Sequence, residues 1–265
     1  MKKEKEQKTN VETTLLEGLR ALSIEPSESI VKSFMTYLQE LKKWSKTHNL
    51  TAITDDTEIV TKHFLDSLLF LNGIPAEAKT LLDVGSGAGF PGIPIKIVRP
   101  ELVVTLMEPR KKRAVFLRHM IHILKLPDTD VCEDRLEDLE IDKFTPFDCV
   151  VVRAAFSVSD FIQLASPLIG THGCLVLGKG KGYESEIQKN SDDYKIDIIH
   201  SKIPLTETER FILVVKHIGL RSNKLRKREG ASPPLNPPPR GRFPLAPGFV
   251  VQEWGGLPNF FFGCV

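Results

Sequence analysis

A glycine-rich turn constrains the fold of this chain more than any other feature. Residues 81–92 read Leu-Leu-Asp-Val-Gly-Ser-Gly-Ala-Gly-Phe-Pro-Gly. The apolar start predicts a short buried strand, and Gly85, Gly87 and Gly89 predict a turn whose backbone a ligand can approach closely. A strand that ends in such a turn and opens into a helix directs backbone N–H groups at a ligand. The sequence therefore predicts an α/β fold with a ligand site at the carboxyl end of this strand.

A lone acid marks the end of the next apolar run, Val103–Met107. This acid, Glu108, lies 23 residues after Gly85, where a second parallel strand would end beside the first. A carboxylate at that place can accept hydrogen bonds from both hydroxyls of a ribose. The combination predicts a nucleotide-like cofactor.

Two cofactor classes compete for this motif. Residues 87–92 satisfy the dinucleotide pattern G-x-G-x-x-G, but a turn that starts at the strand end, at Gly85, requires its third glycine where the chain has Phe90. The acid two residues before the first glycine, Asp83, would repel a pyrophosphate and suits the cationic amino-acid end of S-adenosylmethionine. We therefore favour a methyl donor over a dinucleotide. A glycine-rich turn without any ligand is the third interpretation.

Composition narrows the class of protein. The chain has 265 residues, of which 41% are hydrophobic, and no apolar run of 18 residues, so we expect one good core, no membrane span and a cytoplasmic protein. Its four cysteines show no C-x-x-C spacing, which predicts reduced thiols rather than a zinc site. The net charge is only +2, so a nucleic acid would have to bind local basic patches. Nothing in the sequence indicates oligomers, and we expect a monomer.

The first part of the chain, residues 1–73, is expected to be a helical region packed on the core. Ser29–Thr47 carries apolar residues at the spacing of one helix face. A second helix is predicted from about Thr57 to Leu71, with Asp55 as its cap and Gly73 at its end.

The pattern then changes to alternating strands and helices, which predicts a domain over 74–218 with a Rossmann-like, mostly parallel seven-stranded sheet. Because the methyl-donor motif lies inside it, we expect this to be the methyltransferase domain. The predicted strands are Leu81–Val84, Val103–Met107, Asp130–Cys132, Cys149–Val152 and Cys174–Leu177, with Lys195–Ile203 and Arg210–His217 as a closing antiparallel pair. Residues 219–265 hold eight prolines and seven glycines, and we expect a disordered tail there.

The residues in and after the fourth predicted strand indicate which class of methyl acceptor the chain could use. The Asn/Asp-Pro-Pro-aromatic loop typical of amine methylation is absent, since the chain reads Asp-Cys-Val-Val-Val-Arg-Ala-Ala from Asp148. Cys149 lies inside the strand and is interpreted as a packed small side chain rather than a nucleophile. N7 of guanine needs no general base, because it carries a lone pair and no proton, so alignment of the reactants suffices.

Two further segments supply candidate ligand contacts. Arg153 leaves the fourth strand at its carboxyl end, where its guanidinium could hold guanine O6, a phosphate or the carboxylate of a cofactor. Leu136 and Glu137 follow the third strand, where an adenine ring would lie; an ordinary solvated loop is the alternative there.

Basic side chains give candidates for RNA contact. Lys111, Lys112 and Arg113 open the helix after Glu108, where cations oppose the helix dipole unless a phosphate is bound; a solvated face explains them equally well. Lys179, in the glycine-rich segment after the fifth strand, could also contact RNA phosphate.

His63 and Asp66 lie one turn apart and could hydrogen-bond to each other; we expect no metal there.

Taken together, several strings of this sequence resemble the glucose-inhibited division protein B family, the ribosomal RNA small-subunit methyltransferase G family, over about residues 30–217. The strings are Trp44 with Asn49–Ile53, Lys62–Ser67, Leu82–Pro94, Thr105–Glu108, Lys111-Lys112, Phe116-Leu117, Arg135–Glu137, Phe147-Asp148, Arg153-Ala154 and Glu209-Arg210.

The resemblance implies a class I fold and methylation of N7 of guanosine 527 in 16S ribosomal RNA with S-adenosylmethionine, on the small ribosomal subunit or an assembly intermediate. It implies a cofactor site formed by Gly85, Phe90, Glu108, Leu136, Glu137 and Arg153, with Glu108 on the ribose. The alternatives are a dinucleotide-dependent oxidoreductase and a non-catalytic ribosome- or nucleotide-binding module. The family does not account for the tail.

Overall fold

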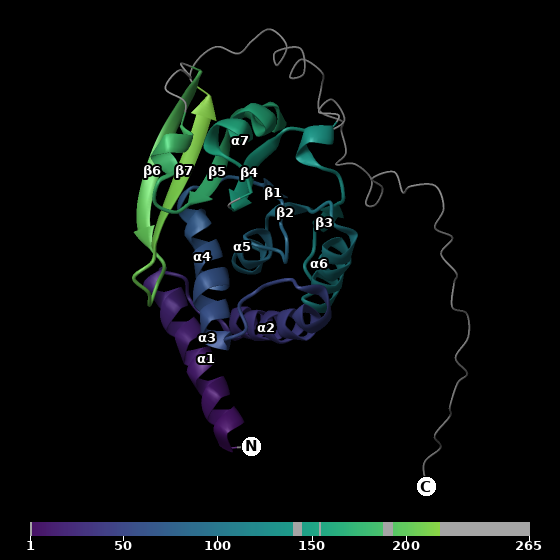
Figure 1. Ribbon diagram of the computed structural model, residues 1–265, viewed down its shortest axis with the longest axis vertical. Helices are drawn as coiled ribbons and strands as arrows, with labels where there is room; N and C mark the ends of the chain where they lie inside the picture. The colour runs from purple at the N-terminus through teal and green to yellow at the C-terminus, as the bar shows by residue number, and fades with distance from the viewer. Residues whose placement is uncertain (1, 140–144, 154, 188–192, 218–265) are drawn as a thin grey trace, which may run out of the picture. The chain divides into compact units, whose positions relative to one another are not determined.

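The computed structural model describes residues 2–139, 145–153, 155–187 and 193–217 (Figure 1). It divides the chain into two units, of which the first ends at Gly219. The tail predicted from residue 219 lies outside the described residues.

The described residues contain a seven-stranded sheet, as predicted. In chain order its strands are β1 (Thr80–Val84), β2 (Val103–Met107), β3 (Thr129–Cys132), β4 (Phe147–Arg153), β5 (Ile169–Lys179), β6 (Tyr194–Lys202) and β7 (Glu209–His217). Their spatial order is β3-β2-β1-β4-β5-β7-β6. The first five run parallel, and β7 pairs antiparallel with both β5 and β6. Because the strand order reverses beside β1, the carboxyl ends of β1, β2 and β4 meet where open α/β sheets bind ligands.

Alternate residues of each central strand enter two different hydrophobic clusters. Leu81 and Val151 belong to the cluster that contains the N-terminal helices, and Leu82 and Val150 belong to the opposite one. This alternation follows from the two-residue repeat of a strand. Because both faces are covered, the strands are continuous apolar runs, which is the pattern that made them predictable.

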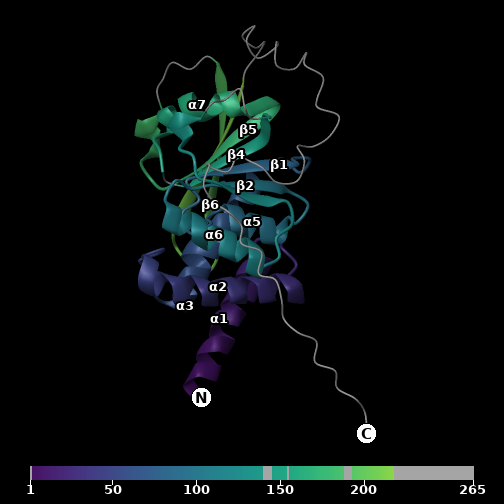
Figure 2. The same cartoon turned by 90° about the vertical axis from the view of Figure 1, so that its right-hand side faces the viewer.

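Helices cover both faces of the sheet (Figure 2). Among these helices are α1 (Lys2–Ala21), α2 (Glu28–His48), α5 (Gly92–Val98), α6 (Lys111–Ile123) and α7 (Val158–Ala165). Helices α5 and α6 pack on one face and α7 on the other. Helix α2 lies beyond α5 and α6, and α1 packs against the helical run 56–72.

The N-terminal helices share a core with the sheet. Ser27 caps α2 by accepting a hydrogen bond from the N–H of Ile30 at 3.3 Å. The apolar face predicted for this helix is buried, with Phe34 and Leu41 fully covered. On α2, Trp44 packs against Phe116 of α6 at 5.5 Å between ring centroids. The boundary at residue 73 is thus a change of secondary structure within one packed unit.

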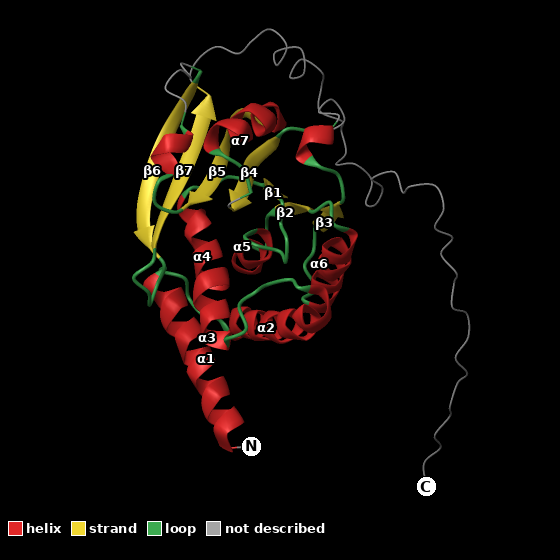
Figure 3. Cartoon of the chain, viewed as in Figure 1, coloured by secondary structure: helices red, strands yellow, loops and turns green. Residues whose placement is uncertain are grey.

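The second predicted helix is helical throughout but not one regular helix. It comprises α3 (Asp56–Ile59), the π-helix η1 (Val60–Leu65), α4 (Asp66–Leu68) and the 3-10 helix η2 (Leu69–Asn72). The predicted cap forms, because the Asp55 carboxylate accepts a hydrogen bond from the N–H of Glu58 at 2.9 Å. Figure 3 shows these segments as one continuous run. Apolar periodicity could not reveal the wider π turn. No helix among the described residues is long and apolar enough to span a membrane.

Candidate active site

The glycine-rich turn begins directly after β1. Gly85, Gly87 and Gly89 have φ of +68°, +61° and +98°, and β1 ends at Val84. The turn therefore starts at the end of the strand, where the in-register interpretation places it, and the dinucleotide pattern of residues 87–92 begins two residues later, inside the turn. The N–H of Ser86 donates to the carbonyl of Met107 in β2 at 2.9 Å, which ties the turn to the neighbouring strand.

Only glycine fits at position 89. A Cβ there would lie 2.5 Å from Cδ1 of Ile93 and 2.6 Å from Oη of Tyr37, in addition to the positive φ. The Tyr37 hydroxyl, which comes from α2, donates a hydrogen bond to the carbonyl of Ala88. The N-terminal helices therefore hold the turn directly.

Asp83 is fully buried beneath the turn. Its Oδ2 accepts a hydrogen bond from the N–H of Gly92 at 2.9 Å, whereas Oδ1 has no hydrogen-bond partner among the described residues. Burial raises the pKa of this carboxyl to about 7, although Arg153 nearby and these hydrogen bonds oppose the rise. An unpaired buried carboxylate oxygen is costly, and a cationic ligand group would offset this cost.

Glu108 holds the turn from the end of β2. Its Oε2 accepts a hydrogen bond from the N–H of Gly87 and its Oε1 from the N–H of Arg110, each at 2.9 Å. The side chain is nearly buried, and Arg113 lies 3.8 Å from Oε2. A carboxylate has about four acceptor positions, so these bonds leave capacity for ribose hydroxyls. We had not predicted that Glu108 also shapes the turn.

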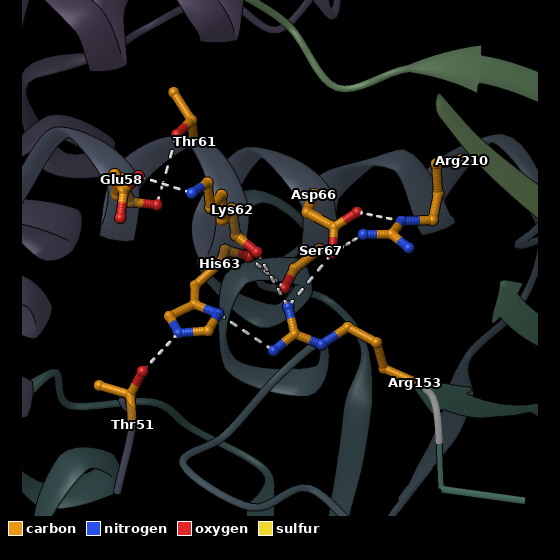
Figure 4. A network of polar contacts seen from close by, with 9 residues as sticks. All are labelled: Thr51, Glu58, Thr61, Lys62, His63, Asp66, Ser67, Arg153 and Arg210. Atoms are coloured by element: carbon orange, nitrogen blue, oxygen red, sulfur yellow. Dashed lines mark hydrogen bonds and ion pairs between the residues drawn. The ribbon is translucent and has the colours of Figure 1, made fainter. Parts of the chain in front are cut away.

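Arg153 ends β4 beside the turn, because Val84 and Val152 are paired in the sheet. Its guanidinium lies over the ring of Phe90, 5.0 Å from the centroid. Nη1 donates to the carbonyl of Lys62 at 3.4 Å, and Nη2 lies 3.2 Å from Nδ1 of His63. Figure 4 shows this side chain reaching across to the helical run 56–72. It is therefore not a surface arginine.

The predicted hydrogen bond between His63 and Asp66 is absent. Each of these side chains contacts Arg153 instead, Asp66 through Oδ2 at 3.4 Å. The π-helical turn directs both toward the strand ends rather than toward each other. His63 also stacks on Phe90 at 4.7 Å between ring centroids. No cluster of three His, Cys, Asp or Glu side chains suited to a metal occurs in the described part of the chain.

The remaining cofactor candidates surround the same end of the sheet. Phe90 is buried, and its ring also stacks on Tyr37 at 5.4 Å. Leu136 is buried at the start of the 3-10 helix η3 (Leu136–Asp138), and the side chain of Glu137 is exposed. This segment follows β3, which ends opposite Met107. Both residues therefore lie near the strand end that carries Glu108.

The basic candidates separate into two groups. Lys111 and Lys112 are exposed at the start of α6, and Arg113 is half-buried and directed at Glu108. Lys179 does not lie in a segment after the fifth strand, so that predicted placement is wrong. It ends β5, and its ammonium forms an ion pair with Glu186 at 2.6 Å and donates to the carbonyl of Phe156. A buried ammonium with these partners is not free to contact a phosphate.

Cys149 is a packed side chain, as predicted. It is fully buried in β4, with Sγ 3.8 Å from Sγ of Cys174 in β5. Burial raises the pKa of the Cys149 thiol well above its usual value, so the thiolate that a nucleophile requires is disfavoured.

Five residues of this site were not assigned to it from sequence. They are Tyr37, Thr51, His63, Asp66 and Arg210. One signal was available: Asp66 interrupts the apolar run Phe-Leu-Asp-Ser-Leu-Leu-Phe, and a charged side chain inside such a run is buried only when it is paired. Sequence does not show which cations pair with it.

Comparison with known proteins identifies the family. The profile of the family rRNA small subunit methyltransferase G matches residues 30–213. A protein named ribosomal RNA small subunit methyltransferase G from Pelotomaculum thermopropionicum is 39% identical over 226 residues, 82% of this chain and 95% of the relative. The protein of that name from Acetivibrio thermocellus is 33% identical over 88% of this chain and 98% of its own length.

Among solved structures, a methyltransferase from Geobacter sulfurreducens matches with a TM-score of 0.49 and 12% identity over 68% of this chain and 88% of that one. The strand order and the turn after β1 are those of class I methyltransferases, in agreement with the family match. The chain belongs to the rRNA small subunit methyltransferase G family and is an S-adenosylmethionine-dependent methyltransferase.

Proposed function

We propose that this enzyme transfers the methyl group of S-adenosylmethionine to N7 of guanosine 527 in the 16S ribosomal RNA of the small ribosomal subunit or its assembly intermediate. The observation that carries the proposal is the pair of buried carboxylates, Asp83 and Glu108, on either side of the glycine turn. The family match supports the RNA as substrate.

The residues of the turn fit this cofactor. The orphaned Oδ1 of Asp83 would meet its ammonium group, and the remaining acceptor positions of Glu108 would meet its ribose hydroxyls. Phe90, Leu136 and Glu137 would contact the rest of the molecule. A dinucleotide fits less well, since its pyrophosphate would lie above the buried carboxyl of Asp83. When bound, S-adenosylmethionine supplies a methyl group on a positively charged sulfur.

The chain's own residues are suited to positioning rather than to proton transfer. Burial and the Arg153 charge lower the pKa of His63 to about 4, and its ring contacts both Arg153 and Thr51. Arg153 itself is too basic to act as a general base. An acceptor such as N7 of guanine, which loses no proton, matches a site of this kind. Alignment of reactants contributes about 7–11 kcal/mol in favourable cases.

We propose that the RNA backbone contacts the exposed start of α6. Lys111 and Lys112 are exposed there, and Arg110 precedes them. Phosphates near this end would interact favourably with the lysines and with the helix dipole. Neutralising each lysine should reduce the salt dependence of RNA binding by about one unit of slope.

The experiment is incubation with tritiated S-adenosylmethionine and small subunits from a strain that lacks this methyl group, followed by mapping of the label. Label at N7 of guanosine 527 supports the proposal, and label at another nucleotide would contradict it. Calorimetry with S-adenosylmethionine and with NAD is the control. Cofactor binding without label would indicate a non-catalytic module or a different substrate, and NAD binding alone would favour the oxidoreductase.

A further inference from the structure

Two arginines from different strands share one buried carboxylate. Asp66, only 2% exposed, accepts hydrogen bonds from Nε of Arg210 at 2.6 Å and from Nη2 of Arg210 at 3.1 Å. Nη1 of Arg153 approaches Oδ2 of the same carboxylate at 3.4 Å. Figure 4 shows Asp66 between the two guanidiniums. The tighter, two-point contact with Arg210 in β7 fixes the carboxylate, and this carboxylate then limits where Arg153 can lie.

His63 contacts Arg153 as a hydrogen-bond acceptor. A guanidinium has no acceptor atom, so Nδ1 of His63, 3.2 Å from Nη2, must carry the lone pair. The proton of the neutral ring is then on Nε2, which donates to Oγ1 of Thr51 at 2.7 Å. Oγ1 of Thr51 also accepts from the N–H of Ile53 at 3.1 Å. These contacts fix the tautomer and the orientation of the ring.

The π-helix η1 brings these acceptors to one place. The carbonyl of Lys62 and the ring of His63 both lie within this segment, and Asp66 follows it directly. Single wide turns of this kind occur mostly where a helix serves a site. Here the turn presents three acceptors to one guanidinium that comes from the opposite side of the site.

Some N–H donors of Arg153 have no partner among the described residues. Two N–H groups of Nη1 and one of Nη2 are used by Lys62, His63 and Asp66, which leaves Nε–H and one N–H of Nη2 without a partner among the described residues. Phe90 supports the face of the guanidinium. The structure thus holds the side chain on one side and leaves donors on another.

We propose that Asp66 and His63 are positioning residues, which hold the guanidinium of Arg153 over the ring of Phe90 so that its two remaining donors point into the methyl-donor site. Arg210 acts one step further away, by fixing Asp66. This inference rests on the proposed function for the identity of the site, and on the contacts alone for the dependence of Arg153 on Asp66.

A double-mutant cycle tests the dependence. The variants are Asp66→Asn, Arg153→Lys and the two combined, and the readouts are the Kd for S-adenosylmethionine and kcat on small subunits. We expect each single variant to lose about tenfold or more in one of these readouts. The combined variant should be within about twofold of the worse single variant, because Asp66 acts through Arg153. Losses that multiply would overturn the proposal.

The matched control is Arg99→Lys. Arg99 is as buried as Arg153, with side chains 17% and 19% exposed, but it contacts carbonyls at the other end of the sheet. In combination with Asp66→Asn, the effect of Arg99→Lys should simply add to that of Asp66→Asn. Alone, Arg99→Lys should leave the Kd for S-adenosylmethionine unchanged. Coupling of Asp66 to Arg99 as strong as to Arg153 would indicate general loss of structure and would overturn the proposal.

His63 provides a second test that does not remove a buried charge. His63→Asn keeps an acceptor oxygen near the place of Nδ1, whereas His63→Phe keeps the stacking on Phe90 and removes the acceptor. We expect His63→Asn to retain more activity, by about tenfold. The reverse order would show that stacking matters and that the acceptor does not. If the wild type labels no subunits, the proposed function fails, and the cycle is still read from cofactor binding and thermal midpoints.

Discussion

The hydrogen-bonding groups of similar buried side chains are paired more completely at one end of the sheet than at the other. Near the amino end of β1, Arg99 donates to three carbonyls, those of Pro75, Ala76 and Ala78, at 2.9–3.2 Å, and its Nε contacts Glu101 at 2.6 Å. At the carboxyl end, Arg153 has contacts of 3.2–3.4 Å and keeps two donors unpartnered among the described residues.

The same difference separates two further buried ionic groups, Lys96 and Asp83. Lys96, near the amino end of β2, is 1% exposed and donates to the carbonyls of Pro100 and Leu102. Asp83, at the carboxyl end of β1, has an oxygen without a partner. Buried polar groups are normally satisfied. The end whose groups are satisfied stabilises the fold, and the end with spare donors and acceptors is the one prepared for ligands.

The largest effect we expect concerns the unpaired carboxyl. The pKa of Asp83 is raised from 3.8 to about 7, so between these pH values the folded protein retains a proton that the unfolded chain has lost. The contribution of Asp83 to the stability of the wild type therefore falls as pH rises from about 4 to 8, by roughly 4 kcal/mol. Asp83→Asn lacks this loss. Its free energy of unfolding relative to the wild type, measured with urea, should increase over that pH range.

A difference between Asp83→Asn and the wild type that stays constant with pH would contradict this burial argument. The same variant should bind S-adenosylmethionine more weakly, because an amide carries no charge to pair with the ammonium group. A gain in stability accompanied by a loss of affinity would sharpen the contrast between the two ends of the sheet.

The next effect concerns the shape of the turn. Gly89→Ala must adopt a φ of +98° and place its Cβ within 2.6 Å of Ile93 and Tyr37, which should cost roughly 2–4 kcal/mol. Gly180→Ala is the control, since a Cβ there meets no atom within 4 Å. Thermal unfolding of both variants measures the difference. Equal midpoints would show that the turn tolerates a side chain.

The next effect concerns Glu108, whose carboxylate binds the turn and, in our proposal, the ribose of the cofactor. Glu108→Ala removes hydrogen bonds to a charged acceptor worth roughly 1.5–3 kcal/mol, which corresponds to a ten- to hundredfold loss of affinity for S-adenosylmethionine. The Kd of Glu108→Gln, which keeps one acceptor oxygen, should lie between those of the wild type and Glu108→Ala. Calorimetry measures both Kd values. An unchanged Kd in Glu108→Ala would contradict the ribose assignment.

The smallest effect tests the contact between α2 and the turn. Tyr37→Phe removes the hydrogen bond to the carbonyl of Ala88 and retains the stacking on Phe90. We expect a loss of about 1 kcal/mol in the free energy of unfolding. A change in the Kd for S-adenosylmethionine larger than that in stability would assign α2 a direct role in the site.

Much of the fold could be predicted, because central strands covered on both faces are short apolar runs between turn residues. Some strands are longer than predicted, because they continue through residues that are not apolar and buried. Strand β5 begins at Ile169 rather than Cys174, and its added residues include the half-exposed Gly170 and the exposed Thr171 and His172. Part of the candidate active site was predictable for a similar reason. Gly85 and Glu108 occupy places that the strand ends and the turn determine locally.

Contacts across the chain were not predictable. Lys179 looked like a loop residue because glycines surround it, and only the packing of η6 (Tyr183–Glu186) brings Glu186 to its ammonium. His63 and Asp66 are at helical spacing, which favours a bond between them. Arginines from distant strands bind them instead: Arg153 of β4 contacts both, and Arg210 of β7 makes the shorter contacts with Asp66.

By itself, the sequence determined the α/β sheet, the glycine turn, the position of Glu108 and the family to which the chain belongs, since each depends on residues close together in the chain. Only the tertiary structure decided that Asp83 has an unpaired oxygen and that Asp66 joins Arg153 to Arg210, whose residue numbers differ by up to 144. The energy of a buried charge depends on every group that packs around it, and local sequence does not specify those groups.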